Sequence, residues 1–542
     1  MRHTFKKVWR KGDVFIWLSG AGLAFSLILV AALLGAIFFN ASQFFWPREA
    51  VTFYLDDGRT ILGEITEREA IPDPGNPEAP PKYRIQIKQG NRDIYGTDFL
   101  WIDKDAIQST KKSDDSVVVE RREWGNFYGT IKEVRDQGKT LASGPEKGLA
   151  AIRKLLPAAT DIYKKFKRVS KKDIGAINHS KEENRLELKS LALKGITSGE
   201  TVDRLKAKEK EFQRQYQKLE ATLNQLKKSQ TAEVVFTTAD GREKVIPLAL
   251  IIRVDAPNRF GWLDRAGFFI SKVWEFIVDE PREANTEGGV FPAIFGTVMM
   301  VLIMSLMATP LGVLAAFYLR EYAKHGPMVS AVRIAINNLA GVPSIVFGVF
   351  GVGFFIYFVG GSIDRFFFAE SLPTPTFGTG GILWASLTMA LLTVPVVIVS
   401  TEEGLASVSN GIREASLALG ATKFETTWRI VLPAVMPSIL TGLILAMARA
   451  AGEVAPLMIT GVVKLAPSLP VDGIWPFVHL ERKFMHLGFH IYDVGFQSPN
   501  VDAARPMVFT TTLLLIVIIL LLNFGAILLR NRLRKKLAVS SV

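Results

Sequence analysis

The chain has 542 residues, of which 49% are hydrophobic and 22% are charged, and its mean hydropathy is +0.22. This length exceeds a single soluble domain, and the mixture of apolar and charged residues indicates a membrane protein with a large aqueous part. Cysteine is absent, which excludes disulfides and thiolate metal sites. The net charge of +13 is compatible with nucleic-acid binding, but much of the excess flanks apolar segments. We therefore expect a lipid bilayer, and no nucleic acid, as the partner of these charges.

The N-terminal segment predicts a transmembrane helix that is retained in the chain. Basic residues at positions 2–11 precede an uncharged run from Val14 to Phe39. Such a run exceeds the short apolar core of a signal peptide, and about 20 residues suffice to span a bilayer. The aromatic residues at 44–46 are typical of a membrane interface. We assign residues 1–46 to a cytoplasmic N-terminus and the first transmembrane helix.

Residues 47–287 predict an α+β domain outside the membrane. Alternating apolar and polar residues around Asp-Gly and Gln-Gly-Asn turns predict β-hairpins at 51–65, 83–103 and 232–254. A heptad pattern at 202–226 predicts a long helix, and a helix near 182–194 can fold back on it. The expected architecture is a small β-domain with an inserted helical hairpin.

The last part of this domain, residues 260–277, predicts an amphipathic helix that leads back to the membrane. The charged residues Asp264, Lys272, Glu275 and Asp279 fall roughly on one helical face. An interfacial helix fits this pattern, and a short buried helix of the domain fits it equally well.

Five further apolar segments predict the remaining transmembrane helices. Their ranges are 288–319, 334–363, 371–401, 430–461 and 506–529. Six spans place the basic clusters of the short loops on one side, which the positive-inside rule makes cytoplasmic. Residues 288–530 thus form a membrane core and residues 531–542 a basic cytoplasmic tail. Both termini are expected in the cytoplasm.

The loop at 402–433 carries a specific pattern, because residues 414–433 read EASLALGATKFETTWRIVLP. Strong helix formers precede a glycine that can end a helix in the left-handed conformation, and a second amphipathic turn follows. Spacing alone is also compatible with an ordinary loop between two spans. The residues Glu414, Ala415, Gly420, Ile430 and Pro433 resemble the EAA loop of bacterial ABC-importer permeases. The resemblance implies that these residues form a coupling helix that docks on a separate ATPase subunit.

Three neighbouring stretches narrow the resemblance to the phosphate permeases of the Pst system. They are NNLAGVPSIVFG at 337–348, LLTVPVVIVSTEE at 391–403 and ARAAGEVAPLM at 448–458. The last stretch, together with Trp428, resembles the PstA type more than the PstC type. The resemblance implies a multi-pass permease of the bacterial inner membrane that carries inorganic phosphate. Its implied partners are a PstC-like subunit, an ATPase dimer and a periplasmic phosphate-binding protein. The resemblance does not extend to 47–287, where the usual members have a short loop.

Arg449 and Glu453 lie in the predicted span at 430–461, where several prolines and glycines are close in the sequence. Charges inside a span are costly and are typical of a substrate pathway. A guanidinium can bind phosphate oxygens bidentately, which supports an anion site at mid-membrane. At i,i+4 spacing the two side chains can also neutralise each other, so a purely structural ion pair is the alternative.

We find no sequence pattern that predicts catalysis in this chain. A P-loop, an HExxH pair and a nucleophile elbow are all absent from the sequence. ATP hydrolysis is therefore expected on a partner subunit, and no cofactor is expected. His479, His486 and His490 could approach a metal, but packed or interfacial histidines fit them better, so no metal site is predicted. The alternatives to a phosphate permease are a permease for another oxyanion, and a membrane-anchored scaffold or sensor of the uptake complex.

Overall fold

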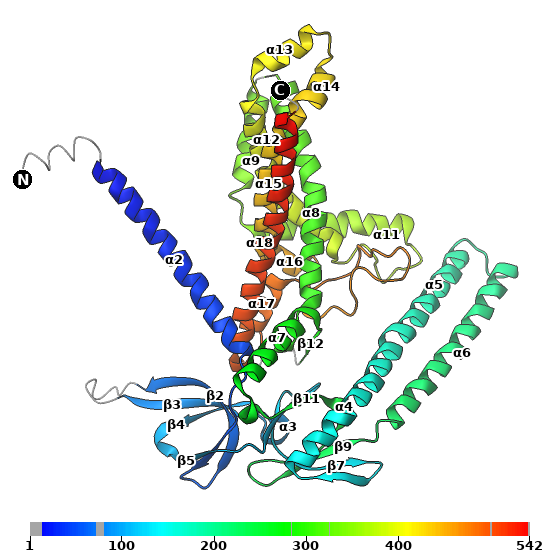
Figure 1. Cartoon of the computed structure of the whole chain (residues 1–542). Helices are drawn as coiled ribbons and strands as arrows, with labels where there is room; N and C mark the ends of the chain where they lie inside the picture. Colours follow the sequence, from blue (N-terminus) through cyan, green and yellow to red (C-terminus); the bar gives the residue numbers. More distant parts are fainter. Residues whose placement is uncertain (1–12, 72–80, 283–284, 325, 499–500, 540–542) are drawn as a thin grey trace, which may run out of the picture.

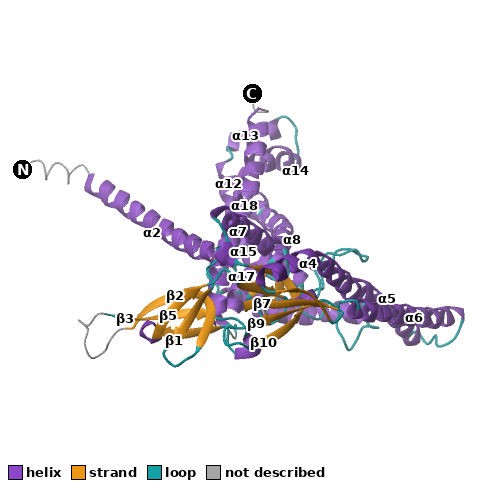
Figure 2. Cartoon of the chain, turned by 60° about the horizontal axis from the view of Figure 1, so that its bottom comes forward, coloured by secondary structure: helices purple, strands orange, loops and turns teal. Residues whose placement is uncertain are grey.

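The computed structural model describes residues 13–71, 81–282, 285–324, 326–498 and 501–539. A helical bundle joins, at one end, an extramembrane domain that contains β-sheets and a helical hairpin (Figures 1 and 2). Six helices of the described residues are long and apolar enough to cross a membrane. This architecture confirms the prediction of an α-helical membrane protein with an additional α+β domain.

The six candidate spans are formed by continuous helices or by helices joined through π-helical turns. Three spans are single helices: α2 (Asp13–Phe45), α12 (Ile382–Ser407) and α18 (Val501–Val539). The second span is α8 (Phe291–Phe317) followed by a π-helical turn at Tyr318–Tyr322, and the third joins α10 (Ser344–Phe350) through a π-helical stretch to α11 (Gly361–Phe367). The fifth joins α14 (Lys423–Thr426) through a π-helical turn to α15 (Leu432–Gly452). The shorter helices α9 (Pro327–Leu339), α13 (Asn410–Ala418), α16 (Ala455–Thr460) and α17 (Leu487–Phe496) connect them.

Two of the predicted spans begin later than expected. The span expected from 334 begins at Ser344, because the preceding Pro343 has the non-helical angles φ −54° and ψ 134° and separates α9 from α10. The span expected from 371 begins at Ile382. The intervening loop is held by Asp364, whose carboxylate accepts bonds from the Phe377 and Gly378 amides at 2.9 and 2.6 Å.

The span expected at 430–461 is shifted toward the N-terminus. It begins at Lys423 and runs through Pro433 to Gly452, so the expected bounds of 430 and 461 are wrong. A π-helical turn at Thr427–Val431 precedes the proline. Such a turn relieves the backbone where a proline lacks its amide hydrogen.

Helix α12 forms the centre of the bundle, between α8 and α15 (Figure 1). Small residues let these helices approach closely. A Cβ atom at Gly312 of α8 would lie 2.7 Å from the Val397 side chain of α12, and one at Gly442 of α15 would lie 2.7 Å from Ser400. Close backbone contact of this kind stabilises helix packing in a membrane, where no hydrophobic effect drives association.

The extramembrane domain, the described part of residues 47–287, contains two large antiparallel sheets, and the short strands β12 (Pro281–Arg282) and β13 (Glu287–Gly288) pair at its end. The first has the order β4-β3-β2-β1-β5, and the second has the order β10-β9-β7-β6-β11, with β8 paired to β7. The strands are β1 (Val51–Leu55), β2 (Thr60–Ile71), β3 (Lys82–Lys88), β4 (Phe99–Asp103), β5 (Ile107–Lys112), β6 (Ser116–Arg121), β7 (Phe127–Asp136), β8 (Lys139–Ser143), β9 (Glu233–Thr237), β10 (Glu243–Pro247) and β11 (Ile251–Asp255). The three predicted hairpins are present, whereas β5 to β8 were not predicted.

A helical hairpin interrupts the second sheet between β8 and β9 (Figure 2). Its first arm runs through α4 (Pro145–Arg168), a π-helical turn and α5 (Ile174–Leu193), and its second arm is α6 (Glu200–Lys228). The first arm is therefore much longer than the predicted helix near 182–194. The arms are joined by a buried hydrogen bond in which the Asn184 amide donates to the Leu205 carbonyl at 3.0 Å.

Helix α7 (Trp262–Val278) connects the domain to the bundle. On one face, Lys272 and Glu275 belong to a cluster of ion pairs with Glu120 of β6. On the other face, Trp262 and Trp274 are exposed. This two-sided arrangement agrees with an interfacial helix.

Glu120 is the buried centre of that cluster. Arg282 and Arg253 approach its carboxylate at 2.7 and 3.1 Å, and Lys272 also donates to it. Burial opposes the charge, yet the three cations hold the pKa of Glu120 well below its ordinary value. Because the folded-state pKa is the lower one, the carboxylate stabilises the fold above the ordinary pKa of about 4.3, and this stabilisation is lost as the pH falls below it.

We expect Glu120→Gln to lower the free energy of unfolding of the extramembrane domain by about 3 kcal/mol, because it removes the more buried of the two carboxylates that the three cations share and leaves them with Glu275. Thermal unfolding of the purified chain, followed by circular dichroism, measures the change. Glu69→Gln is the control, since Glu69 forms an exposed pair with Arg84 at 2.6 Å. Exposed pairs contribute about 1 kcal/mol or less. Equal melting temperatures for the two variants would contradict the central role of Glu120.

Candidate functional site

The loop between α12 and α15 folds into a compact helical tip, residues 409–431. Its first helix, α13, begins where the Ser409 hydroxyl accepts a bond from the Gly411 amide at 3.2 Å. It ends before Gly420, which has a φ of +88°. That left-handed conformation favours glycine, as the sequence predicts. The helix that the helix-forming residues before Gly420 predict is thus present, at Asn410–Ala418.

A second helical segment, α14, packs against α13 through one buried polar contact and begins with its own capping box. The Ser416 and Thr426 hydroxyl oxygens lie 2.8 Å apart in a buried position. Thr422 and Glu425 form a reciprocal capping box at the start of α14, with bonds of 2.9 and 3.2 Å. The serine at 416, which replaces an alanine of the EAA pattern, therefore joins the two halves of the tip.

Arg413 anchors the tip to the ends of two spans. Its guanidinium pairs with Glu321 at 2.8 Å and donates to the carbonyl oxygens of Leu405 and Val408 at 2.9 and 2.6 Å. A second cation, Lys423, lies 5.0 Å above the ring of Tyr322. The sequence analysis did not predict a role for Arg413, although this residue directly precedes the predicted coupling residue Glu414.

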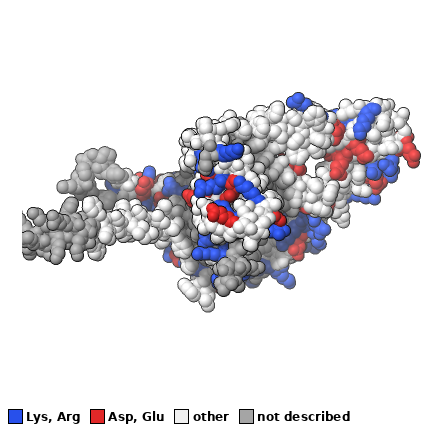
Figure 3. Space-filling view, turned by 90° about the horizontal axis from the view of Figure 1, so that it is seen from above, with Lys and Arg blue, Asp and Glu red and all other residues white. Residues whose placement is uncertain are grey.

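The outer surface of the tip combines exposed apolar and charged side chains. Leu419 is 90% exposed, and Trp428 is 60% exposed and stacks on Phe424 with a ring separation of 6.3 Å. Seen from this end of the bundle, basic and acidic side chains gather at the tip, among uncharged side chains (Figure 3). Large apolar groups in contact with solvent, with charges around them, are typical of a protein-binding surface.

The structure places four of the five predicted coupling residues in this tip and the fifth, Pro433, directly after it, at the end of the bundle opposite the sheets (Figure 1). Glu414 and Ala415 are exposed on α13, and Gly420 forms the elbow. Ile430 lies in the π-helical turn, and Pro433 follows in the first turn of α15, where it is half-buried.

The predicted pair of charges lies at a break in a helix. Arg449 is in the last turn of α15, and Glu453 directly follows the helix with extended backbone angles of φ −80° and ψ 140°. The Arg449 Nε atom lies 3.6 Å from Glu453 Oε1, and the side chains are 35% and 24% exposed. The chain continues into α16, above α17 in the bundle (Figure 1). Broken helices in a membrane are tolerated where the backbone is buried in protein or lines a cavity.

The three histidines do not form a metal site in the described part of the chain, where no group of three metal-binding side chains occurs. His479 lies between the carboxylates of Asp472 and Glu481, at 3.0 and 3.2 Å. His486 and His490 are buried around the start of α17. Their positions agree with packed histidines.

Comparison with known proteins shows which proteins the membrane core is similar to. Residues 308–538 match the family model described as "Binding-protein-dependent transport system inner membrane component". The chain is 38% identical over 172 residues to "Phosphate transport system permease protein PstA" of Mycobacterium leprae, covering 32% of this chain and 51% of that relative. Its membrane core is PstA-like. The chain thus spans about half the length of this relative, and the extramembrane domain lies before the region that the family model matches.

Two further relatives are also named as permease proteins. "Probable ABC transporter permease protein YqgI" of Bacillus subtilis is 29% identical over 235 residues, which cover 42% of this chain and 74% of the relative. "Phosphate transport system permease protein PstC" of Xylella fastidiosa is 29% identical over 238 residues, which cover 42% of this chain and 73% of the relative. The PstA-like core is therefore also similar to permeases of the PstC type.

Proposed function

We propose that this PstA-like chain is the transmembrane permease subunit of an ATP-driven importer of inorganic phosphate. The observation that carries the proposal is the exposed tip at 409–431, which combines the EAA residues with an apolar docking surface. A permease needs such a surface to receive force from an ATPase. The name of the M. leprae relative supports phosphate as the transported anion.

In this proposal the chain itself does not hydrolyse ATP. An ATPase dimer binds the tip, with Glu414 and Ala415 on the contacting helix and Gly420 as the elbow. Ile430 and Pro433 transmit the movement to α15, because no break in the helix separates them from Gly452. Arg413, which bonds to both α12 and the end of α8, transmits it to those spans.

The phosphate pathway in this proposal passes Arg449 and Glu453. The contact between them, at 3.6 Å, is longer than a hydrogen bond, so the guanidinium can still donate to phosphate oxygens. Partial exposure of both side chains supports a position on a pathway or at a subunit boundary. A PstC-like subunit would complete the pathway, and a periplasmic phosphate-binding protein would deliver the anion.

A scaffold or sensor role is the second candidate, and the extramembrane domain favours it, because this domain lies outside the region that the family model matches. Uptake of radiolabelled phosphate in a strain that lacks the chain decides between the two. Transport predicts that uptake is lost and is restored by the complete chain. Uptake that persists without the chain would support the scaffold. Restoration of sulfate uptake instead would indicate a different oxyanion.

We further propose a location in the bacterial inner membrane with both termini in the cytoplasm. A protease added outside spheroplasts is then expected to cut the helical hairpin at 145–228, while the tip at 409–431 stays intact. Immunoblots against tags at the two termini identify the fragments. Permeabilised spheroplasts are the control, in which both regions become accessible. Cleavage of the tip in intact spheroplasts would show that the chain has the opposite orientation in the membrane.

A further inference from the structure

A cavity lies where the extramembrane domain meets the membrane helices. Its volume is about 560 Å³, within the usual range of small-molecule sites. The C-terminal end of α2, the N-terminal part of α18 and the segment before α8 all contribute to its wall. A second hollow of about 690 Å³ shares five lining residues with it, among them Trp46 and Arg48. The proposed transport function uses neither space.

The membrane side of this double cavity is aromatic. Phe44 and Phe45 of α2 line the first cavity together with Phe509 of α18. The second hollow extends along α2 to Phe39, whose side chain is 64% exposed on the surface of the span. Since a span's exposed apolar surface faces lipid, this hollow can admit an acyl chain from the bilayer.

The domain side of the cavity carries hydrogen-bond donors from the first sheet. Gln86 of β3 is only 3% exposed, and its Nε2 atom has no hydrogen-bond partner, while its Oε1 atom accepts a bond from the Thr66 hydroxyl at 2.7 Å. Lys88 lies two residues further, on the same face of the strand. Arg48 donates to the Ile65 carbonyl at 2.9 Å through one of its terminal nitrogens.

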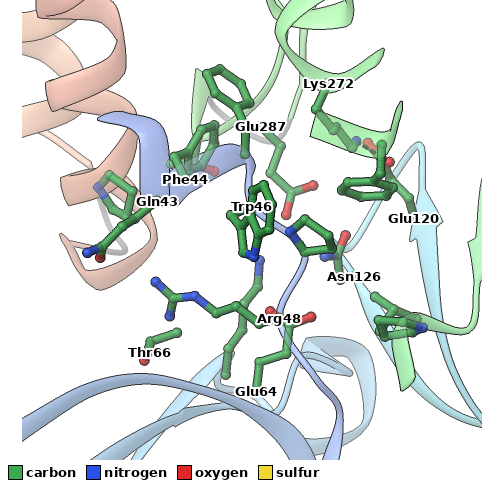
Figure 4. A pocket seen from close by; sticks show the side chains of 18 of the residues that line it. Gln43, Phe44, Trp46, Arg48, Glu64, Thr66, Glu120, Asn126, Lys272 and Glu287 are labelled. Carbon is green, nitrogen blue, oxygen red and sulfur yellow. Dashed lines mark hydrogen bonds and ion pairs between the residues drawn. The ribbon is translucent and has the colours of Figure 1, made fainter. Parts of the chain in front are cut away.

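The carboxylate of Glu64 lies beside these donors. Glu64 of β2 is the direct cross-strand neighbour of Lys88 and also lines the cavity. Figure 4 shows the side chains of Trp46, Arg48 and Glu64 around the same space, with the Arg48 side chain extended toward Thr66. The cavity therefore offers a buried donor, two half-buried cations, an acidic acceptor and an aromatic wall.

We propose that this junction binds a phospholipid with a zwitterionic ethanolamine headgroup. The phosphodiester oxygens accept bonds from Gln86, Lys88 and Arg48, and the ammonium group donates to Glu64. The acyl chains lie against the aromatic residues and along α2. A free phosphate would match the donors but would place a second anion beside Glu64 and would leave the aromatic wall uncovered. An unsatisfied buried amide such as that of Gln86 is costly, so filling the cavity with an acceptor stabilises the junction.

Native mass spectrometry of the complete chain, purified and delipidated in detergent, tests the proposal. The chain is titrated with dioleoyl phosphatidylethanolamine, with dioleoyl phosphatidylglycerol and with inorganic phosphate. We expect one tightly bound phosphatidylethanolamine and at least tenfold weaker binding in Lys88→Gln. Lys82→Gln is the matched control, because Lys82 is an exposed residue of the same strand. It should bind the lipid as the wild type does.

A second variant separates loss of the contact from loss of the fold. Gln86→Glu keeps the shape of the side chain but replaces its free donor with an acceptor, so binding should again weaken at least tenfold. Melting temperatures recorded without lipid report whether each variant folds. Equal affinity for phosphatidylethanolamine in the wild type and both variants would overturn the proposal. Equal or tighter binding of phosphatidylglycerol, or displacement of the lipid by inorganic phosphate, would also overturn it.

Discussion

Arg449→Ala is expected to lower phosphate uptake by more than tenfold, because it removes the guanidinium that we propose contacts the anion. The same change leaves Glu453 without its partner. Stranding a fully buried charge costs about 3–5 kcal/mol, and the 24% exposure of Glu453 reduces that cost. The loss of uptake must therefore be distinguished from a loss of assembly.

The double change Arg449→Gln with Glu453→Gln makes this distinction, because it removes both charges and keeps hydrogen-bonding side chains of similar size. Neutral replacement of an ion pair is often tolerated by the fold. We expect normal assembly with uptake still reduced more than tenfold. Arg530→Gln is the control, since Arg530 contacts Thr441 of the same helix α15 at 3.2 Å, away from the break. Normal uptake in the double variant would reduce the pair to a structural role.

Gly420→Pro is expected to uncouple the tip from transport while the chain still inserts in the membrane. The glycine has a φ of +88°, whereas proline holds φ near −65°, so the elbow between α13 and α14 has to change direction. No other atom lies within 4 Å of a Cβ atom built at Gly420, so the effect comes from the backbone and not from a clash. Uptake and stimulation of the partner ATPase should both fall more than tenfold.

Gly411→Ala provides the matched comparison within the same tip. Gly411 lies in the first turn of α13 without a positive φ, and a Cβ atom there meets only the Ser409 hydroxyl at 3.6 Å. Uptake and ATPase stimulation should remain normal in this variant. If Gly420→Pro also retains both activities, the tip does not couple the chain to an ATPase.

Local sequence patterns determined much of this architecture. Uncharged runs of sufficient length predicted six spans, because a segment in lipid has to satisfy its backbone within itself and expose apolar side chains. The turns at Asp57-Gly58 and Asp240-Gly241 predicted their hairpins for an equally local reason, since few residues adopt the required backbone angles. Gly420 predicted the elbow of the tip in the same way.

Segment boundaries depended on interactions beyond the local pattern. The absence of charge alone did not separate α9 from α10 or exclude the loop at 371–381, since residues 334–343 and 371–381 contain no charged side chain. The backbone break at Pro343 and the bonds of Asp364 to the loop decide where those helices begin. Strand β5 pairs with the distant β1, and β7 pairs with the distant β9, which no local pattern reveals. The pairs β6-β7 and β7-β8 are local and were not predicted either.

Only the tertiary structure revealed which distant residues act together. Arg413 pairs with Glu321, which lies 92 positions earlier. Glu120 pairs with Lys272 and Arg282, which lie more than 150 positions later. The lipid-binding cavity likewise combines α2, β2, β3 and α18. The sequence by itself determined the spans, the turns and the EAA residues, because each depends on neighbouring side chains. Contacts between remote segments require the packed fold, since periodicity carries no information about which surfaces meet.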